Sequence, residues 1–194
     1  MLQPCQEKER RQIKSFGWII RDAVDEIGIG NMMVSPTVPL SNVPPWLLGE
    51  LEVDLHLLEW KKENSIDRSQ VSRYQEEKYS MFTKIYTDAS KTDDNRVGAA
   101  FIIPETNVML NKRVNDKMSV FTGEMLAILL ALEWVENSRP MEVLTGSDSS
   151  SALTSIKNMQ SEARQDIMLE IAQTVFRSSS KIHLDSSPYR SRRK

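Results

Sequence analysis

The order of predicted secondary structure after residue 83 constrains the fold more than any other feature of the chain. Residues 83–90, 97–104 and 108–114 are three strand-like segments, joined by short polar links that favour an antiparallel meander. Apolar periodicity then predicts a helix over 121–137, a strand over 141–147, and helices over 148–158 and 161–178. The order β-β-β-α-β-α-α predicts an α/β fold with a mixed sheet flanked by helices.

A connection rule extends this prediction to the pairing of the strands. The helix over 121–137 joins the third strand to the fourth, and right-handed crossovers dominate such connections. We therefore expect residues 141–147 to lie beside residues 83–90 and parallel to them. The segment KIHL, residues 181–184, could begin a fifth strand.

The first 80 residues have a different character, and we predict that they form a separate N-terminal region, followed by a domain over 81–194. Residues 6–28 show helical periodicity, and residues 29–50 contain four prolines, which favours an extended linker. The alternating segment EVDLHL, residues 52–57, predicts a strand, and the charged residues 61–80 predict a helix. The amphipathic helix also allows a different function, as the docking face of a protein-interaction module.

Composition excludes several classes of protein. A net charge of −2 opposes a pure nucleic-acid-binding module but not an enzyme with an acidic site. Cys5 is the single cysteine, so an intramolecular disulfide is impossible. The longest apolar run, residues 125–132, is shorter than the ~20 residues that span a bilayer, and the first residues lack the apolar core of a secretory signal. We expect an intracellular protein of the cytoplasm or nucleus, without a membrane partner.

Three acidic residues occupy distinct positions in the predicted elements. Asp88 lies in the first strand, Glu124 near the start of the apolar helix, and Asp148 where the fourth strand passes into a helix. If these elements pack together, the three carboxylates converge and require a cation. Oxygen ligands suit divalent metals such as Mg²⁺, and paired metals catalyse phosphodiester cleavage.

Each carboxylate also has an ordinary structural explanation. Asp88 could end its strand and start a turn with Ser90, Glu124 could favour the positive end of the helix dipole, and Asp148 could be a helix N-cap. The helix-dipole explanation for Glu124 has a difficulty. Helical spacing places Glu124 on one stripe with Ile128, Ala131 and Val135, and this stripe should face the sheet. An uncompensated carboxylate buried there is costly.

Together, the segments YTDAS, TGEMLAILLAL and GSDSSSAL resemble the motifs of a type 1 ribonuclease H domain, of the kind at the C-terminal end of non-LTR retrotransposon polyproteins. The resemblance covers about residues 83–180 and places Asp88, Glu124 and Asp148 on three catalytic carboxylates of the family. It implies a metal-dependent endonuclease that hydrolyses the RNA strand of RNA–DNA hybrids.

The resemblance also implies a cofactor and residue roles. The cofactor would be Mg²⁺, with Mn²⁺ possible, and the partner would be an RNA–DNA hybrid. Asp88 would bridge two metals, Glu124 and Asp148 would each hold one side, and Ser90 would contact the substrate.

The sequence departs from the family in two places. Ala89 replaces a usual glycine, and the residues after 184 do not supply the family's catalytic histidine loop and final carboxylate-bearing helix. The resemblance thus implies a ribonuclease H-like mixed sheet whose final strand and helix are incomplete, with an N-terminal helical and linker extension. His183 and Asp185 match no motif. We expect activity below that of a complete domain, and the alternative is a catalytically impaired retroelement-derived remnant that at most binds nucleic acid.

Overall fold

The computed structural model of the chain describes residues 51–57, 68–115, 118–159 and 164–186, together with Asp22, Ala23, Asp25, Glu26 and Leu48. Internal contacts divide the chain into two units, Met1–Leu40 and Ser41–Lys194. The four described residues of the first unit are helical. Most of the predicted helix over 6–28 and of the linker over 29–50 lies outside the described residues.

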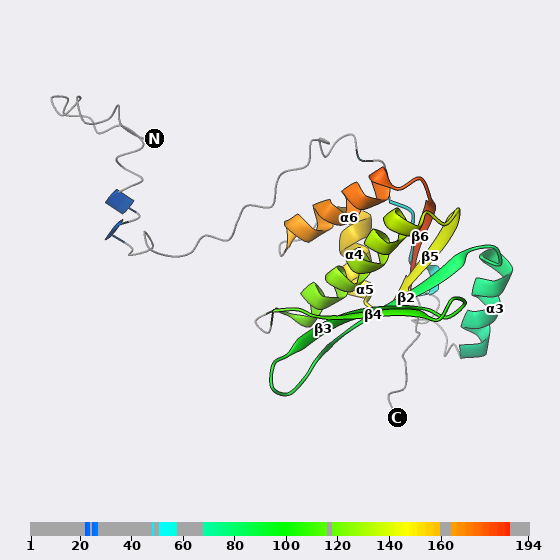
Figure 1. Cartoon of the computed structure of the whole chain (residues 1–194), viewed down its shortest axis with the longest axis horizontal. Helices are drawn as coiled ribbons and strands as arrows, with labels where there is room; N and C mark the ends of the chain where they lie inside the picture. Colours follow the sequence, from blue (N-terminus) through cyan, green and yellow to red (C-terminus); the bar gives the residue numbers. More distant parts are fainter. Residues whose placement is uncertain are drawn as a thin grey trace. The chain divides into compact units, whose positions relative to one another are not determined.

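The second unit contains a six-stranded mixed sheet in the order β1-β6-β5-β2-β3-β4 (Figure 1). Strands β2, β3 and β4 form an antiparallel meander, whereas β5 is parallel to β2, β6 to β5, and β1 to β6. The strands are β1 (Val53–Asp54), β2 (Thr83–Lys91), β3 (Val97–Ile103), β4 (Val108–Arg113), β5 (Glu142–Ser147) and β6 (Lys181–Ser186).

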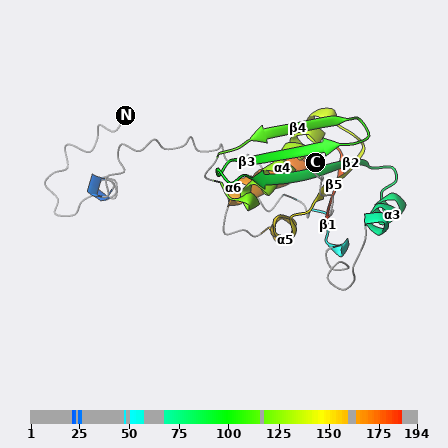
Figure 2. The same ribbon diagram turned by 90° about the horizontal axis from the view of Figure 1, so that it is seen from below.

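Helices cover this sheet, and their bounds are α3 (Arg68–Lys78), α4 (Val120–Ser138), α5 (Ser150–Asn158) and α6 (Gln165–Arg177). The longest of them, α4, packs against β2 and β3 and also contacts α6. Figure 2 shows α4 and α6 together behind the meander. The core lies between these helices and one face of the sheet, and includes Ile85, Phe101, Ile128, Ile171 and Leu184.

The structure confirms the α/β class, the mixed sheet, the meander and the parallel pairing of β5 with β2. KIHL does begin a strand, and β6 continues to Ser186. The helix predicted over 161–178 is described from Gln165 to Arg177, and its residues Ile167 and Ile171 are buried.

The strand predicted over residues 52–57 is shorter than expected. Only Val53 and Asp54 are extended, and His56 and Leu57 already have helical geometry. The Asp54 side chain explains the early end, because its Oδ1 accepts a hydrogen bond from the His56 N–H at 2.8 Å. Such a local bond stabilises a turn in place of a continuing strand.

The opposite face of the sheet carries α3, through a chain of polar contacts. Strand pairing places Tyr86, Gly146, Asp185 and Asp54 in one row across four strands, and a row shares one face. The Tyr86 hydroxyl donates to Gln75 Oε1, and Gln75 Nε2 donates to Asp185 Oδ2. Strand β1 belongs to the sheet and α3 packs on it, so these residues upstream of 81 lie in the same unit as the rest of the sheet. The domain boundary at residue 81 stays a prediction.

A second set of contacts joins α3 to β1. Asp54 Oδ2 accepts hydrogen bonds from Lys78 Nζ, from the Tyr74 hydroxyl at 3.0 Å and from the Tyr79 hydroxyl at 3.3 Å. Burial opposes the charge on Asp54, but the bonds from Lys78, the His56 backbone and Tyr74 outweigh it and lower the pKa of Asp54 to about 2. Asp54 is therefore the ionised acceptor that holds α3 to the edge strand.

No helix among the described residues is long and apolar enough to cross a membrane.

We predict that Asp54→Asn lowers the free energy of unfolding by about 1–3 kcal/mol, because Lys78 and two tyrosines lose a charged acceptor. Urea titration at neutral pH measures the change. The matched control is Glu77→Gln, which breaks an exposed pair with Arg73 at i,i+4 spacing and should change the value by less than about 0.5 kcal/mol. Equal losses in the two variants would contradict the role of Asp54. The contribution should be complete above pH 3.8 and disappear as the pH falls towards 2.

Candidate metal centre

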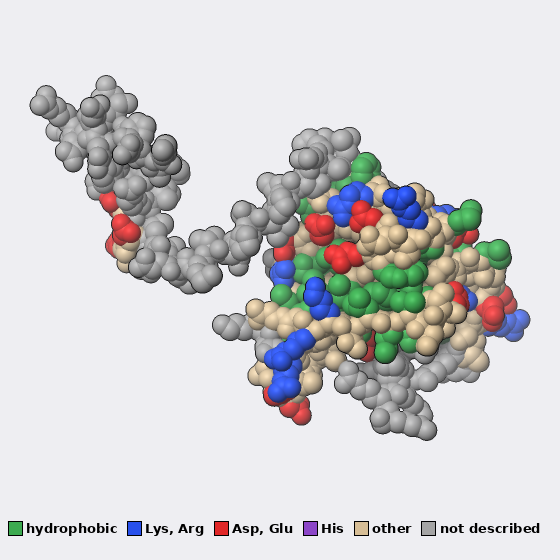
Figure 3. All heavy atoms as spheres, in the orientation of Figure 1, with side chains coloured by type: hydrophobic (Ala, Val, Ile, Leu, Met, Phe, Trp, Pro, Cys, Tyr) green, Lys and Arg blue, Asp and Glu red, His purple; other side chains and the backbone are tan. Residues whose placement is uncertain are grey.

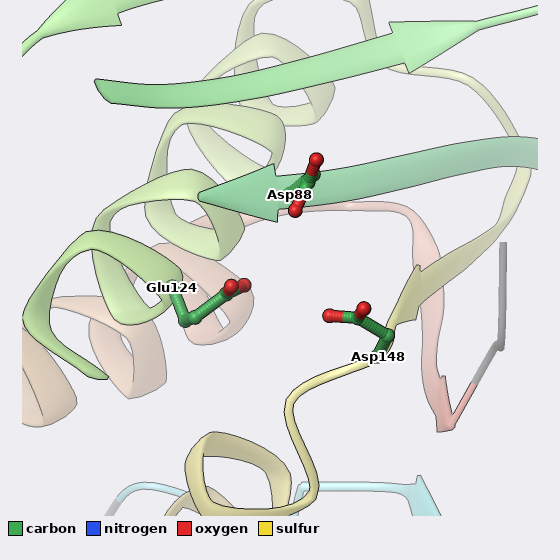
Figure 4. A group of neighbouring side chains, drawn as sticks. All are labelled: Asp88, Glu124 and Asp148. Carbon is green, nitrogen blue, oxygen red and sulfur yellow. The ribbon is translucent and has the colours of Figure 1, made fainter. Parts of the chain in front are cut away.

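Three carboxylates from three elements converge at one end of β2. Asp88 lies on β2, Glu124 on α4, and Asp148 directly after β5 (Figure 4). One oxygen of each side chain lies within 4.8 Å of an oxygen of the other two. Figure 4 shows the carboxylates of Glu124 and Asp148 pointing towards one another, with Asp88 beside them. The three residues predicted from sequence are therefore neighbours in space.

Parallel pairing of β2 with β5 accounts for two of the three positions. Thr87 is paired with Ser147, so the next residues, Asp88 within β2 and Asp148 just after β5, lie at the same level. A helix connects these strands, and the crossover rule brings them together. The convergence of the two aspartates thus follows from the topology of the sheet.

The position of Glu124 depends on a close approach of α4 to β2. A Cβ atom added at Gly123 would lie 3.0 Å from the Ala89 Cβ and 3.1 Å from Val97 Cγ1, which is closer than such atoms normally pack. With no side chain at this position, Glu124 reaches the strand, and its Oε1 accepts a hydrogen bond from the Ala89 N–H at 3.2 Å. Glycine is therefore the residue that fits between the helix and the sheet.

The burial of α4 confirms the predicted stripe. Ile128, Ala131 and Val135 are fully buried, and Glu124 is only 5% exposed. Glu124 is the fifth residue of the helix, and no acidic residue occupies its first turn. The helix-dipole explanation for Glu124 is therefore wrong.

The structure also excludes the ordinary explanations for the two aspartates. Strand β2 continues to Lys91, so Asp88 does not end it. The N-cap of α5 is Ser149, whose hydroxyl accepts a hydrogen bond from the Ala152 N–H, so Asp148 does not have this role. The helix cap and the acid of the cluster are therefore two different, adjacent residues.

Burial makes Glu124 hard to ionise. It raises the pKa of Glu124 to about 8, and the neighbouring charges of Asp148 and Asp88 act in the same direction. The hydrogen bond from the Ala89 N–H opposes the shift without cancelling it. Glu124 Oε2 is buried and has no hydrogen-bond partner within the described part of the chain. A buried polar atom without a partner is costly, and a bound cation would provide one.

The donor set fits a hard divalent cation. It consists of carboxylate oxygens, two of the three residues are at least partly exposed, and the buried member has an oxygen to spare. Mg²⁺ binds in such places through one or two carboxylates and keeps several waters. Asp88, Glu124 and Asp148 could therefore hold a metal ion.

The remaining candidate, Ser90, lies near the cluster, whereas the two histidines lie elsewhere. Ser90 is on β2 and lines the same pocket as Asp88. His183 lies on β6 between the rings of Tyr79 and Phe82, and His56 is exposed and stacks on Tyr74. No motif assigned these histidines a catalytic role, and neither belongs to the acidic cluster.

Sequence reasoning overlooked two residues that matter in the structure. Asp185 is fully buried, accepts a hydrogen bond from Gln75, and has its pKa raised by burial to about 6. It lies outside the acidic cluster. Gly123 immediately precedes Glu124, and a glycine next to a predicted buried acid was the available signal of a close approach.

We predict that, without divalent cation, the melting temperature falls as the pH rises from about 6.5 to about 8. Folded Glu124 keeps its proton up to about pH 8, whereas the unfolded chain loses it near 4.5, so unfolding becomes easier with rising pH. Burial lowers the pKa of His183, which titrates below this window with the opposite sign, and Asp185 titrates near 6. Calorimetry across this range measures the slope.

Saturating Mg²⁺ or Mn²⁺ should remove the slope and stabilise the fold by about 2–3 kcal/mol at roughly 100 times the dissociation constant. Glu124→Gln is the matched variant, because it keeps the shape of the side chain without the charge. It should show a flat profile above pH 6.5 and a smaller response to metal. An equal response in both proteins would show that Glu124 does not bind the cation.

No protein-family model matches the chain, and no curated protein matches it in sequence. The geometry of the acidic cluster therefore carries the functional argument.

Proposed function

We propose that the chain is a metal-dependent endonuclease of the ribonuclease H type that hydrolyses the RNA strand of RNA–DNA hybrids. The observation that carries the proposal is the convergence of Asp88, Glu124 and Asp148, together with the buried Oε2 of Glu124, which has no hydrogen-bond partner among the described residues. The six-stranded mixed sheet with its helices is compatible with a ribonuclease H-like fold. The three motifs that resemble the family provide the acids of this cluster.

The three acidic residues share one task in this proposal. Asp88, Glu124 and Asp148 would together hold the divalent metal, with Asp88 as the ligand supplied by the sheet strand. Bound divalent metals supply an activated water and stabilise the leaving oxygen. Because the pKa of Glu124 is about 8, binding the cation at neutral pH requires this side chain to give up its proton.

The exposure of the cluster favours a polymeric substrate. Asp148 is exposed and Asp88 is partly exposed, so the two aspartates of the cluster are accessible from the surface of the domain, whereas Glu124 is buried behind them. Sites for small molecules usually enclose most of the ligand. A phosphodiester strand needs only to place one phosphate against the acids while the rest of the strand stays outside. Ribose 2′-hydroxyl groups would distinguish the RNA strand from the DNA strand.

The test is cleavage of a labelled RNA–DNA hybrid by the full chain with Mg²⁺ and, separately, with Mn²⁺. We expect cuts in the RNA strand, and none in a DNA duplex of the same sequence. Asp88→Asn should lower the rate by at least about 100-fold, because even residues that only support metal ligands cost 10–100-fold. Glu105→Gln is the matched control, since it removes an exposed acidic charge in the β3–β4 turn and should leave the rate unchanged.

Two results would contradict the proposal. One is the absence of cleavage by a sample that melts cooperatively and responds to metal. The other is cleavage that survives Asp88→Asn, which would indicate a contaminating nuclease. In the first case the alternative would stand, a non-catalytic protein that at most binds nucleic acid.

A further inference from the structure

A pocket of about 260 Å³ adjoins Asp88 on the face of the sheet formed by the meander. Its volume lies below the roughly 300–1,000 Å³ of sites that enclose a whole small molecule. Its lining includes Asp88 and Ser90 of β2, Arg96 and Gly98 at the start of β3, and Asn111 and Arg113 of β4. A pocket of this size suits one group of a larger ligand.

Strand register explains why this face is hollow. Asp88, Ala100 and Asn111 form one row across three strands, and Ser90, Gly98 and Arg113 form the next row on the same face. The middle strand thus contributes only Ala100 and Gly98 between longer side chains. A Cβ atom added at Gly98 would lie 3.9 Å from the Lys112 carbonyl oxygen, an ordinary contact distance, so a larger side chain there would enter the pocket.

Charge is unevenly distributed along this pocket. Its lining holds one acid of the metal centre, Asp88, and three basic residues, Arg96, Lys112 and Arg113. Strand register places Arg113, but not Lys112, in a row on the same face as Asp88. Figure 3 shows basic side chains at the lower left, where β2 turns into β3, with acidic side chains beside them. Arg96 pairs with Asp94 at 2.6 Å, but both side chains are more than half exposed, and such pairs exchange partners at little cost.

These features indicate a ligand with an anionic group beside a metal-bound phosphate. Arginine binds phosphate through two parallel hydrogen bonds, and hydroxyl and amide side chains such as Ser90 and Asn111 supply further contacts. The chain as a whole carries a net charge of −2, so the attraction for an anion is local to this pocket. A nucleic-acid strand carries such anions at regular intervals.

We propose that this pocket is a subsite for a backbone phosphate next to the one held at the acidic cluster, with Arg96 and Arg113 as its contacts. The inference rests on the proposed function for the nature of the strand. It adds two residues that position the strand on the metal centre, and it assigns Gly98 the task of keeping the subsite open.

The test measures equilibrium binding separately from cleavage. A fluorescent RNA–DNA hybrid is titrated with the full chain carrying Glu124→Gln in Mg²⁺, at several salt concentrations. Adding Arg96→Gln and Arg113→Gln should weaken binding about tenfold or more. The slope of log K against log salt concentration should also fall by about one or more, as expected when a phosphate contact is lost. The matched control is the pair Arg139→Gln and Lys157→Gln, which removes two exposed cations at the far ends of α4 and α5.

A second variant fills the pocket without changing any charge. Gly98→Val adds a residue that strands favour, at a position with space for it, so the melting temperature should not fall. Binding should still weaken severalfold. In a chain that keeps Glu124, Gly98→Val should leave the shift of melting temperature on adding Mn²⁺ equal to that of the unmodified chain. This last readout shows that the acidic cluster is intact.

The outcomes separate the two proposals. Weaker binding in the pocket variants but not in the control supports the subsite, even if the unmodified chain cleaves nothing. If the chain cleaves, the arginine variants should raise KM with kcat within about twofold, as expected when binding is equal in ground and transition states. Equal effects of the pocket and control pairs, unchanged binding in Gly98→Val, or no hybrid binding by the parent protein would each overturn the subsite.

Discussion

The close contact of α4 with β2 at Gly123 is the constraint on which the rest of the site depends. The helix approaches the strand so closely that a methyl group at residue 123 would crowd Ala89 and Val97. Because of this approach, the carboxylate of Glu124 lies inside the domain, bonded to the Ala89 N–H and beside two aspartates. The remaining buried residues of α4 are apolar or small enough to anchor the helix on the sheet.

This arrangement has an energetic cost that is concentrated at one residue. Glu124 is nearly fully buried, has a pKa of about 8, and has one oxygen without a hydrogen-bond partner in the described part of the chain. A protein selected for stability alone would place an apolar side chain there, since α4 is otherwise an apolar helix against an apolar face. Violations of this kind are expected at functional sites, where the compensating contact comes from a ligand.

The two faces of the sheet divide the tasks of stability and recognition. One face packs its apolar rows against α4 and α6 and supplies most of the core. The other face is polar, with α3 fastened over β1 and β6 through Asp54, Gln75 and Asp185. Among the described residues no helix packs on this polar face over β3 and β4, and the small residues Gly98 and Ala100 leave the pocket beside Asp88. The acidic cluster lies where the two regions meet, at the end of β2.

The sequence by itself determined the order of the elements, the meander, the parallel pairing of β5 with β2 and the buried stripe of α4. These features follow from local periodicity and from the handedness of crossovers, which act over short stretches of chain. Only the tertiary structure decided that Ser149 rather than Asp148 caps α5, that β2 continues past Asp88, and that β1 ends at Asp54. It also decided the burial of Asp185 and the pocket lined by Arg96 and Arg113. The burial of Asp185 and the pocket depend on contacts between residues far apart in sequence. The cap of α5 depends on a choice between two neighbouring residues with similar N-cap propensity. Local sequence patterns encode neither.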